Sequence, residues 1–322
     1  MRIASLFLLF GLALAQGFLP APKTKAPLPP WIKPGLLLAY ADDVGLMRAV
    51  YLVTDVTADT AVGAYLVVAS SPNGMAQAQL NFGALVQNGI GPIYVDQNAA
   101  ARWAQMAAAD PNIEVRATPG YLIVTSGEHQ VSLVYDPNTG LVLEHAEVFA
   151  QNRGQNPPMP NSIHFRLAGR YQLDWPRAAS PPAAAQSPHV YQILTRTIVP
   201  GYPPIEQVLG ELSVSPAGAM PPLYAFQVNV SGPQMPYTGP NQVYGTATYG
   251  PFYLHPALLA REAIFSAPEV GLALVQTGPG EYALTLWNNP IQYLRYDPES
   301  GLLLEERDIV PGLGEQVYLL VR

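Results

Sequence analysis

The sequence predicts a mainly β protein made of two duplicated antiparallel domains, each a curved sheet or open barrel with one packed α-helix. The 322-residue chain has 34 prolines and 27 glycines, and 12% of its residues are charged, which is typical of a folded chain rich in turns. A ten-residue stretch occurs twice, at 135–144 and 296–305, and seven of its ten positions are identical. Strands, one helix and this stretch follow in the same order in both halves.

The repeated stretch has the residues of a tight β-hairpin. Asp136 and Asp297 can accept hydrogen bonds from the backbone ahead of them, and the following proline fixes φ. Gly140 and Gly301 can take the left-handed conformation that closes the turn. We therefore predict a structural role for these four residues. A calcium site is the alternative for the two carboxylates, but the stretch lacks the alternating Asp and Asn spacing of calcium loops.

The first half has the pattern of an antiparallel meander interrupted by one helix. The helix is predicted to begin after Asp96, a favourable N-cap, and to end at Asp110 and Pro111. Apolar runs separated by turn residues predict strands at 49–56, 62–70, 76–82, 112–117, 120–126 and 162–173.

The second half repeats this pattern. The segment 91–94, which precedes the helix, corresponds to 250–253. His255 takes the helix-start position, Pro256 fits the first helical position, and Pro268 is expected to end the helix. Because only two copies occur at this long period, a duplicated domain is favoured over a solenoid.

Composition predicts the boundaries between units of the chain. The segment 175–188 has four prolines among small residues and is typical of a linker. Each half is expected to bury its own core. The predicted units are a signal peptide at 1–15, a proline-rich arm at 16–34, a first β-rich domain at 35–174, the linker at 175–188 and a second β-rich domain at 189–322.

The first 15 residues have the layout of a cleavable secretory signal. A basic start at Arg2 is followed by an apolar run at 3–12 and a small-x-small ending at 13–15. An uncleaved membrane anchor is the alternative, although the run is short for a helix that spans a bilayer. We expect an exported protein of the periplasm, cell surface or extracellular space, with no transmembrane segment after signal cleavage.

Composition and motifs argue against several classes of function. The net charge is −7 and Lys and Arg form no cluster, so nucleic acid is not an expected partner. The chain has no cysteine, its five histidines lack metal-binding spacing, and it has no phosphate-binding glycine loop or nucleophile elbow. We therefore predict no cofactor, no metal site and no catalytic residue, and we favour a protein that is not an enzyme.

One uncharged stretch, at 232–253, is rich in tyrosine, glycine and proline. Aromatic faces beside amide groups suit a glycan or another protein. Tyr237, Tyr244 and Tyr249 are therefore the predicted partner-binding residues. The alternative is that these tyrosines cover the core of their own domain.

Three motifs carry a resemblance to known proteins. They are the start Trp31-x-x-Pro34-Gly35, the repeated Gly-Pro-x-Tyr segment and the repeated Tyr-Asp-Pro-x-Thr/Ser-Gly-Leu hairpin. Together they resemble a loose group of secreted bacterial β-rich proteins, which implies export and a β-rich fold and no activity. The hairpin and the strand-helix-strand order are more distantly similar to the lipoprotein-carrier (LolA-like) folds, in which a curved sheet encloses an apolar cavity.

These features lead to three functional hypotheses. The first is an exported, non-enzymatic cell-envelope protein that binds another surface component, protein or glycan, through the tyrosine-rich stretch. The second is a carrier that encloses a lipid or other apolar ligand in a curved sheet. The third is an extracellular hydrolase with dispersed acidic residues. Export and the absence of a catalytic motif favour the first.

Overall fold

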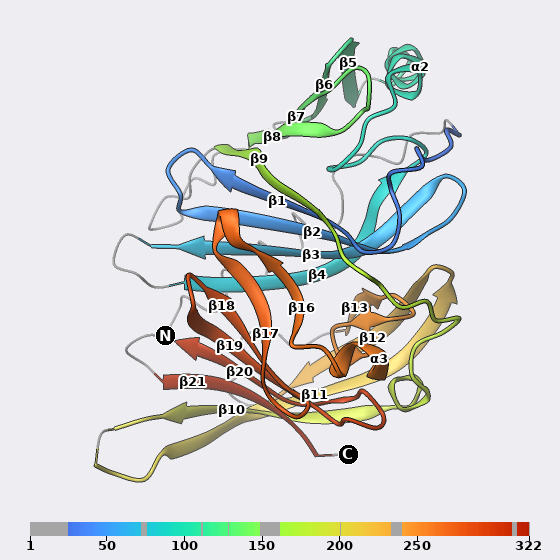
Figure 1. Cartoon of the computed structure of the whole chain (residues 1–322). Coiled ribbons are helices and arrows are strands. Elements are labelled where there is room, and N and C mark those ends of the chain that lie inside the picture. Colours follow the sequence, from blue (N-terminus) through green and yellow to red (C-terminus); the bar gives the residue numbers. More distant parts are fainter. Residues whose placement is uncertain are drawn as a thin grey trace.

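The chain is mainly β, as the sequence predicts, and two large antiparallel sheets make up most of it (Figure 1). The predicted signal peptide at 1–15 and the part of the proline-rich arm before residue 25 lie outside the described residues. The computed structural model describes residues 25–71, 76–110, 112–127, 129–148, 162–199, 201–232, 240–310 and 314–321.

The first sheet has nine strands in the order β4-β3-β2-β1-β9-β8-β7-β6-β5, and every neighbouring pair is antiparallel. One helix, α2 (Gln97–Ala107), follows β4 in the chain and begins at the N-cap Asp96. The strands are β1 (Leu36–Asp42), β2 (Met47–Val56), β3 (Thr60–Ser70), β4 (Ala76–Gln87), β5 (Ile113–Thr118), β6 (Tyr121–Ser126), β7 (His129–Tyr135), β8 (Val142–Val148) and β9 (Ser162–Gln172).

The second sheet has ten strands in the order β13-β12-β11-β10-β21-β20-β19-β18-β17-β16. A separate two-stranded ribbon, β14 (Tyr249–Gly250) with β15 (Tyr253–Leu254), precedes the short helix α3 (Pro256–Leu259). The strands of the large sheet are β10 (His189–Thr197), β11 (Ile205–Met220), β12 (Leu223–Ser231), β13 (Pro240–Gly245), β16 (Ala263–Ala267), β17 (Leu272–Gly278), β18 (Glu281–Leu286), β19 (Asn289–Tyr296), β20 (Leu303–Val310) and β21 (Gly314–Leu320).

The two sheets have the same topology. If β1 is matched with β10, β9 with β21 and β5 with β17, the nine strands of the first sheet follow the order of nine strands in the second, and β16 is an addition at the edge. One buried hydrogen bond is also repeated. The Tyr40 hydroxyl on β1 donates to the Val142 carbonyl over 2.9 Å, and the Tyr191 hydroxyl on β10 donates to the Leu303 carbonyl over 3.0 Å. The duplication therefore extends from the sequence to the topology and to individual contacts.

Both repeated turns are closed by an aspartate and a left-handed glycine. The Asp136 carboxylate accepts the Asn138 backbone N–H over 2.8 Å, and Gly140 has φ +74°. In the second copy the Asp297 carboxylate accepts the Ser300 backbone N–H over 2.7 Å, and Gly301 also has φ +74°. Each turn is thus held by its own side chain as well as by its backbone.

Each closed turn docks on the segment that leads into the helix of its half. In the first half the Val95 N–H donates to the Gly140 carbonyl over 2.8 Å. In the second half the Leu254 N–H donates to the Gly301 carbonyl over 2.9 Å. The two motifs that the sequence repeats therefore contact each other in both halves.

The second helix is shorter than the sequence predicts. Pro256 does occupy the first turn and the His255 ring accepts the Ala257 N–H, but α3 ends at Leu259 instead of continuing to Pro268. Residues 263–267 form the edge strand β16. Its apolar residues Ile264 and Phe265 are both buried, so packing against the second sheet overrides the helical pattern of the alanine-rich start.

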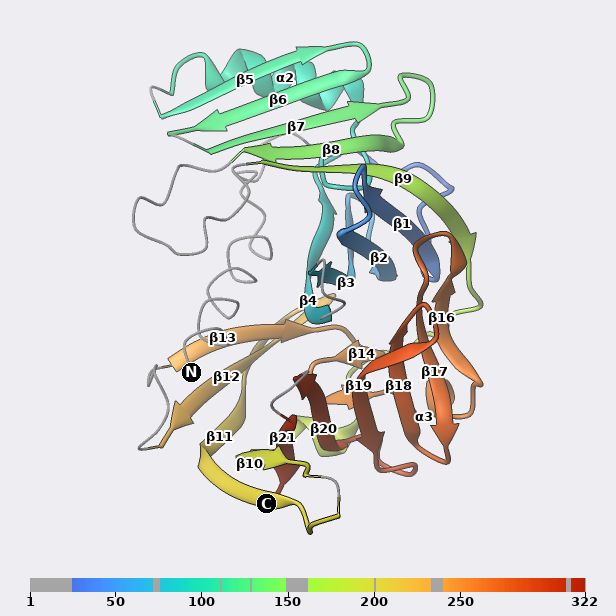
Figure 2. The same cartoon turned by 90° about the vertical axis from the view of Figure 1, so that its left-hand side faces the viewer.

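The largest apolar core is shared by the two halves, whereas two smaller cores are made of first-half residues alone, so the expectation that each half buries its own core holds only in part. One face of β1–β4, with Leu37, Leu52 and Phe82, packs against Leu294 on the concave face of the second sheet and against Tyr249 of the β14–β15 ribbon. The Phe82 and Tyr249 rings meet edge to face, with centroids 4.9 Å apart. Figure 2 shows the second sheet curving from β13 to β16 beneath β4. The first sheet therefore fills the concave side of the second.

The opposite face of β1–β4 lines the curve of the first sheet itself. Leu38, Tyr40 and Tyr51 pack there with Ile163 and Phe165 of β9. Strands β1, β2 and β3 are therefore buried on both faces over most of their length, in agreement with their nearly continuous apolar runs.

The proline-rich segment 175–188 is packed against this shared core. Trp175 is buried, and its indole Nε1 donates to the Thr248 hydroxyl over 2.9 Å. Ala185, in a short 3₁₀ turn at Ala183–Gln186, is buried in the same core. Whether the halves at 35–174 and 189–322 fold separately stays a prediction. The segment between them is nevertheless held by both halves, because Trp175 and Ala185 belong to the core that the halves share.

Replacing the turn glycines should destabilise the whole chain. Gly140→Ala and Gly301→Ala should each cost more than the ~1–2 kcal/mol of a left-handed non-glycine residue. The added Cβ would lie 2.6 Å from the Val95 carbonyl in the first case and against the Leu254 carbonyl in the second. Because the core is shared, scanning calorimetry should show one transition that moves to lower temperature.

Gly127→Ala is the matched control for these two variants. Gly127 also has positive φ, +58°, but its Cβ would meet no atom within 4 Å. It should cost only the backbone strain. Equal losses at Gly127 and Gly140 would contradict a structural role for the docked turn.

Candidate functional site

The structure places the three predicted partner-binding tyrosines in different environments. Tyr249 is only 1% exposed and lies in the shared core. Tyr244 is partly buried on the edge strand β13, and its hydroxyl lies 3.3 Å from the Gln242 side chain. Tyr237 lies outside the described residues. Tyr249 is therefore part of the fold and is removed from the predicted binding surface.

The hairpin carboxylates are occupied by their own turns. Hydrogen bonds from the Asn138 backbone and the Thr139 side chain lower the pKa of Asp136. Hydrogen bonds from Ser300 and then Glu299 lower the pKa of Asp297. Both side chains stabilise a local turn, and no further ligand is needed to account for them.

A polar cluster on the first sheet involves two of the five histidines. The His145 Nε2 atom lies 2.8 Å from the Glu147 carboxylate, and the His129 Nε2 atom lies 3.7 Å from it. Burial alone would raise the pKa of Glu147, but the two imidazoles outweigh burial and hold it at about 2. The cluster therefore keeps an ionised carboxylate in a largely buried place.

Two stacked tyrosines lie close enough to this carboxylate to be affected by it. The rings of Tyr51 and Tyr65 are stacked, with centroids 6.1 Å apart. Burial, followed by the charges of Tyr51 and Glu147, raises the pKa of Tyr65. The Tyr65 hydroxyl has no hydrogen-bond partner among the described residues.

A pair of carboxyl groups occupies the matching place on the second sheet. His145 lies ten residues after Tyr135, and Glu306 lies ten residues after Tyr296. The pairing registers agree, because Glu147 lies opposite Val131, and Asp308 lies opposite Gln292. The same two positions thus hold His and Glu in one half and Glu and Asp in the other.

Gln292 holds the two carboxyl groups together. Its side-chain nitrogen donates to Glu306 over 2.7 Å and to Asp308 over 2.9 Å. Burial, and then the charge of Asp308, raise the pKa of Glu306 to about 8 against the effect of the Gln292 hydrogen bond. Burial likewise raises the pKa of Asp308 to about 6. Sequence reasoning missed this pair, although the duplicated register could have identified it.

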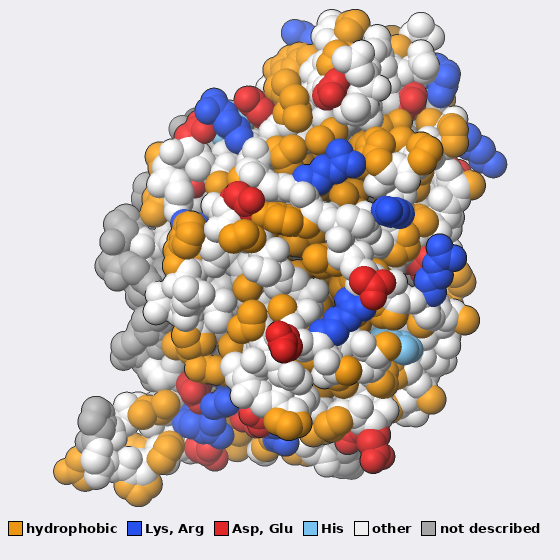
Figure 3. Space-filling view, viewed as in Figure 1, with side chains coloured by type: hydrophobic (Ala, Val, Ile, Leu, Met, Phe, Trp, Pro, Cys, Tyr) orange, Lys and Arg blue, Asp and Glu red, His pale blue; other side chains and the backbone are white. Residues whose placement is uncertain are grey.

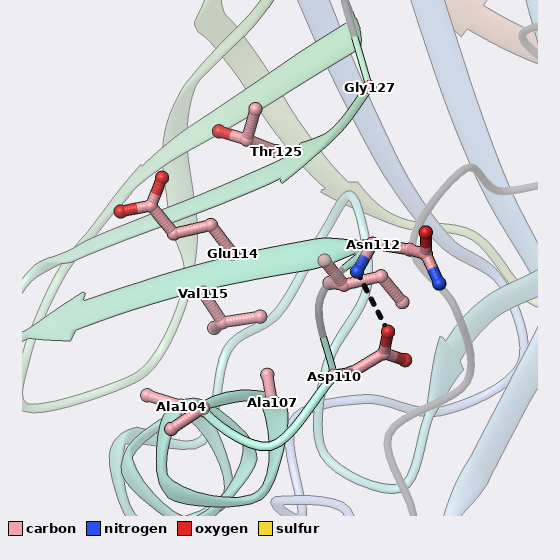
Figure 4. A pocket seen from close by; sticks show the side chains of 10 residues that line it. Ala104, Ala107, Asp110, Asn112, Glu114, Val115, Thr125 and Gly127 are labelled. Carbon is pink, nitrogen blue, oxygen red and sulfur yellow. Dashed lines mark hydrogen bonds between the residues drawn. The ribbon is translucent and has the colours of Figure 1, made fainter.

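The larger of two described depressions lies between the end of α2 and β5 and measures about 540 Å³ (Figure 4). Small residues of α2, including Ala104 and Ala107, line one side, and Glu114 lies on the other. The Asn112 N–H donates to the Asp110 carboxylate over 2.9 Å, and Glu114 is paired with Arg116 over 2.6 Å. The two carboxylates of this shallow depression are therefore already paired.

The other depression measures about 290 Å³ and lies where the two halves meet. Arg48 of β2 lies over the Trp287 ring, 5.6 Å from its centroid, beside Ser70 and Ala76. Neither depression has the enclosed apolar lining of a lipid site. The carrier hypothesis therefore stays a prediction, and among the described cavities none supports it.

Among the described residues, the largest group of exposed apolar side chains lies at the end of the β10–β11 hairpin. This hairpin projects from the body at the lower left of Figure 1, and hydrophobic side chains cover the same projection in Figure 3. Tyr202 is 73% exposed and Ile205 is 62% exposed. We call this surface the apolar hairpin end and define it by Ile198, Val199, Tyr202, Ile205 and Val208.

The local sequence makes the apolar hairpin end stiff. The Tyr202 N–H donates to the Val199 carbonyl over 3.1 Å and closes a turn in which Gly201 has φ +84°. Pro203 and Pro204 then fix φ before Ile205 starts β11. At the base of the hairpin Arg196 pairs with Glu206 over 2.9 Å and with Glu315 over 3.2 Å. The hairpin therefore has an apolar tip, and ion pairs hold its two strands together at the base.

Comparison with known proteins adds no family to these observations. A scan of protein-family models finds no match to the chain, and a search of curated proteins finds no match either. Within the part of the chain that the structure describes, no helix is both long and apolar enough to cross a membrane. No group of three or more His, Asp or Glu in that part is placed to hold a metal ion.

Glu147→Gln should destabilise the protein at neutral pH by about 1–3 kcal/mol, because it removes a charged partner from buried His145. The pKa of Glu147 is lowered in the folded state. Its contribution is therefore fully present above about pH 4.3, the ordinary value for Glu, and is lost as pH falls towards 2. Urea unfolding at pH 7, 4.5 and 2.5 should show less loss of stability in acid for the variant than for the unchanged protein.

Glu144→Gln provides the control on the same strand. Glu144 points to the opposite face, where it pairs with His164 over 3.1 Å at the surface. This variant should stay within ~1 kcal/mol of the unchanged protein. An equal loss of stability in both variants would show that the buried His145–Glu147 contact contributes no more to stability than the surface pair.

Proposed function

We propose that the protein is an exported, non-enzymatic binding protein of the cell envelope and that it attaches to a partner protein through the apolar hairpin end. The observation that carries this proposal is the group of five apolar side chains exposed at one projecting tip. A group of exposed apolar side chains at one tip is typical of interaction sites. Export rests on the sequence of residues 1–15 and stays part of the proposal.

Comparison of the two halves supports a special role for this tip. In the first half the matching connection, 43–46 between β1 and β2, has four residues, and Asp43 pairs there with Arg166 over 3.1 Å. In the second half the connection 198–204 has seven residues and no charge. The tip is therefore a feature that the fold does not require, because the other copy of the same topology lacks it.

The chemistry of the tip favours a protein partner over a glycan or a bilayer. Apart from the Tyr202 hydroxyl, its five side chains offer no hydrogen bond, whereas a glycan needs several. An anionic bilayer surface attracts clustered Lys and Arg. At this base Arg196 is already paired with Glu206 and Glu315. A stiff apolar tip instead suits an apolar groove, because little conformational entropy is lost on docking.

The test replaces the tip residues Ile198, Tyr202 and Ile205 with serine together. The purified chain is mixed with washed envelope fragments from the cells that export it, with the same fragments after protease treatment, and with liposomes of their extracted lipids. We expect the unchanged protein to sediment with untreated fragments only and the triple variant to lose at least tenfold in retention. The melting temperature should be unchanged within about 2 °C, since the replaced side chains are exposed.

Matched exposed apolar residues elsewhere give the control. Val44 is 74% exposed and Met220 is 68% exposed, and both lie outside the apolar hairpin end. A Val44→Ser and Met220→Ser double variant should bind like the unchanged protein. Binding to liposomes would assign the tip to a lipid surface, and retention by the triple variant would discard the tip as the site. A Tyr237→Ala and Tyr244→Ala double variant then tests the tyrosine-rich stretch.

A further inference from the structure

The carboxyl pair of the second sheet lies where the two halves pack together. Gln292 and Asp308 are opposite each other on β19 and β20, close to the turn that carries Trp287. Burial, with the charge of Glu306 as a second cause, raises the pKa of Tyr249, and Tyr249 is the residue on which Phe82 of β4 packs. β4 also contacts β19, the strand from which Gln292 holds the two carboxyl groups, so the pair lies close to the contact between β4 and the second half.

Among the described residues, the groups that face the pair give it no positive partner. They are Gln292 and Tyr296 on β19, Gln316 and Tyr318 on β21, Tyr191 on β10 and Tyr249 on β14. Glu305 and Arg307 alternate with the pair on β20, so they point to the other face, where Arg295 and Glu315 pair with them. From the first sheet, Arg48 reaches the meeting line of the halves but lies over the Trp287 ring.

We propose that Glu306 and Asp308 form a proton-dependent latch between the halves, closed while the pair holds a proton and loosened when both groups are ionised. In the first half the matching positions pair a carboxylate with imidazoles, whereas here two acids share one amide donor. With a proton held by the pair, one carboxyl donates and the cluster carries a single charge. Without it, two like charges lie side by side against tyrosines and apolar side chains, which is unfavourable. This inference is independent of the apolar hairpin end.

The direction of the pH effect follows from the raised pKa values. The folded chain binds protons more tightly than the unfolded chain, in which carboxyl groups titrate near pH 4. Stability from the pair is therefore complete below about pH 4 and is lost as pH rises through about 6 and 8. The latch closes in acid and loosens above neutrality.

Trp287 offers a native reporter of the latch. It is 53% exposed beneath Arg48, at the line where the halves meet. Acrylamide quenching of the full chain at pH 5.5 and pH 8.5, with Trp287→Phe subtracted as background, isolates its signal from the other three tryptophans. We expect quenching of Trp287 to rise at least twofold at pH 8.5. The urea midpoint should fall over the same interval.

Two variants decide whether the carboxyl pair causes this change. Glu306→Gln and Asp308→Asn each remove one charge. At pH 8.5 each variant should therefore show the low quenching and the urea midpoint that the unchanged chain shows at pH 5.5. Glu305→Gln, on the opposite face of the same strand, should respond to pH like the unchanged chain. The proposal is overturned if the unchanged chain shows equal quenching at both pH values, or if all three variants keep its pH response. Should Glu306→Gln not fold, Asp308→Asn alone decides.

Discussion

The docking of the Tyr-Asp-Pro turn on the segment before the helix is the contact on which each half depends. The turn is closed by Asp136 and Gly140 or by Asp297 and Gly301, and the glycine carbonyl then accepts an N–H from the docked segment. A tyrosine of the first strand of each half, Tyr40 or Tyr191, adds a hydrogen bond to a backbone carbonyl just after the turn. Three distant segments of each half therefore meet at one turn. This explains why the turn and the Gly-Pro-x-Tyr segment stay similar in both copies.

The two halves share their strand order and their docked turn, but the side chains in their interiors differ. The first sheet has buried residues on both faces of β1–β4, and one of these faces enters the curve of the second sheet. The second sheet wraps around its neighbour, so its inner positions meet Phe82 and its own tyrosines. Matching positions on β8 and β20 hold a paired His and Glu in one case and two acids in the other. The same register thus supports a charge-neutralised cluster in one half and a proton-binding pair in the other.

Local patterns predicted much of the fold, and long-range packing accounts for what they missed. Alternating apolar runs and turn residues located β2, β3, β6 and β9 within a few residues, and Asp96 does cap α2. The second helix was predicted too long, because burial of Phe265 at the sheet edge is not visible in local propensity. The role of Tyr249 was also decided by packing, since its neighbour Phe82 is far away in the sequence.

The apolar hairpin end and the carboxyl pair were both found by comparing the two halves. Features that both halves share are needed for the fold, whereas a feature that only one half has is not. The turn between β1 and β2 is short and charged, while the one between β10 and β11 is longer, apolar and stiffened by Pro203 and Pro204. Exposing apolar side chains reduces solubility and gains nothing for folding. A tip of this kind is expected to persist only where another surface covers it. The apolar hairpin end is therefore the part of the surface whose form is best explained by a partner.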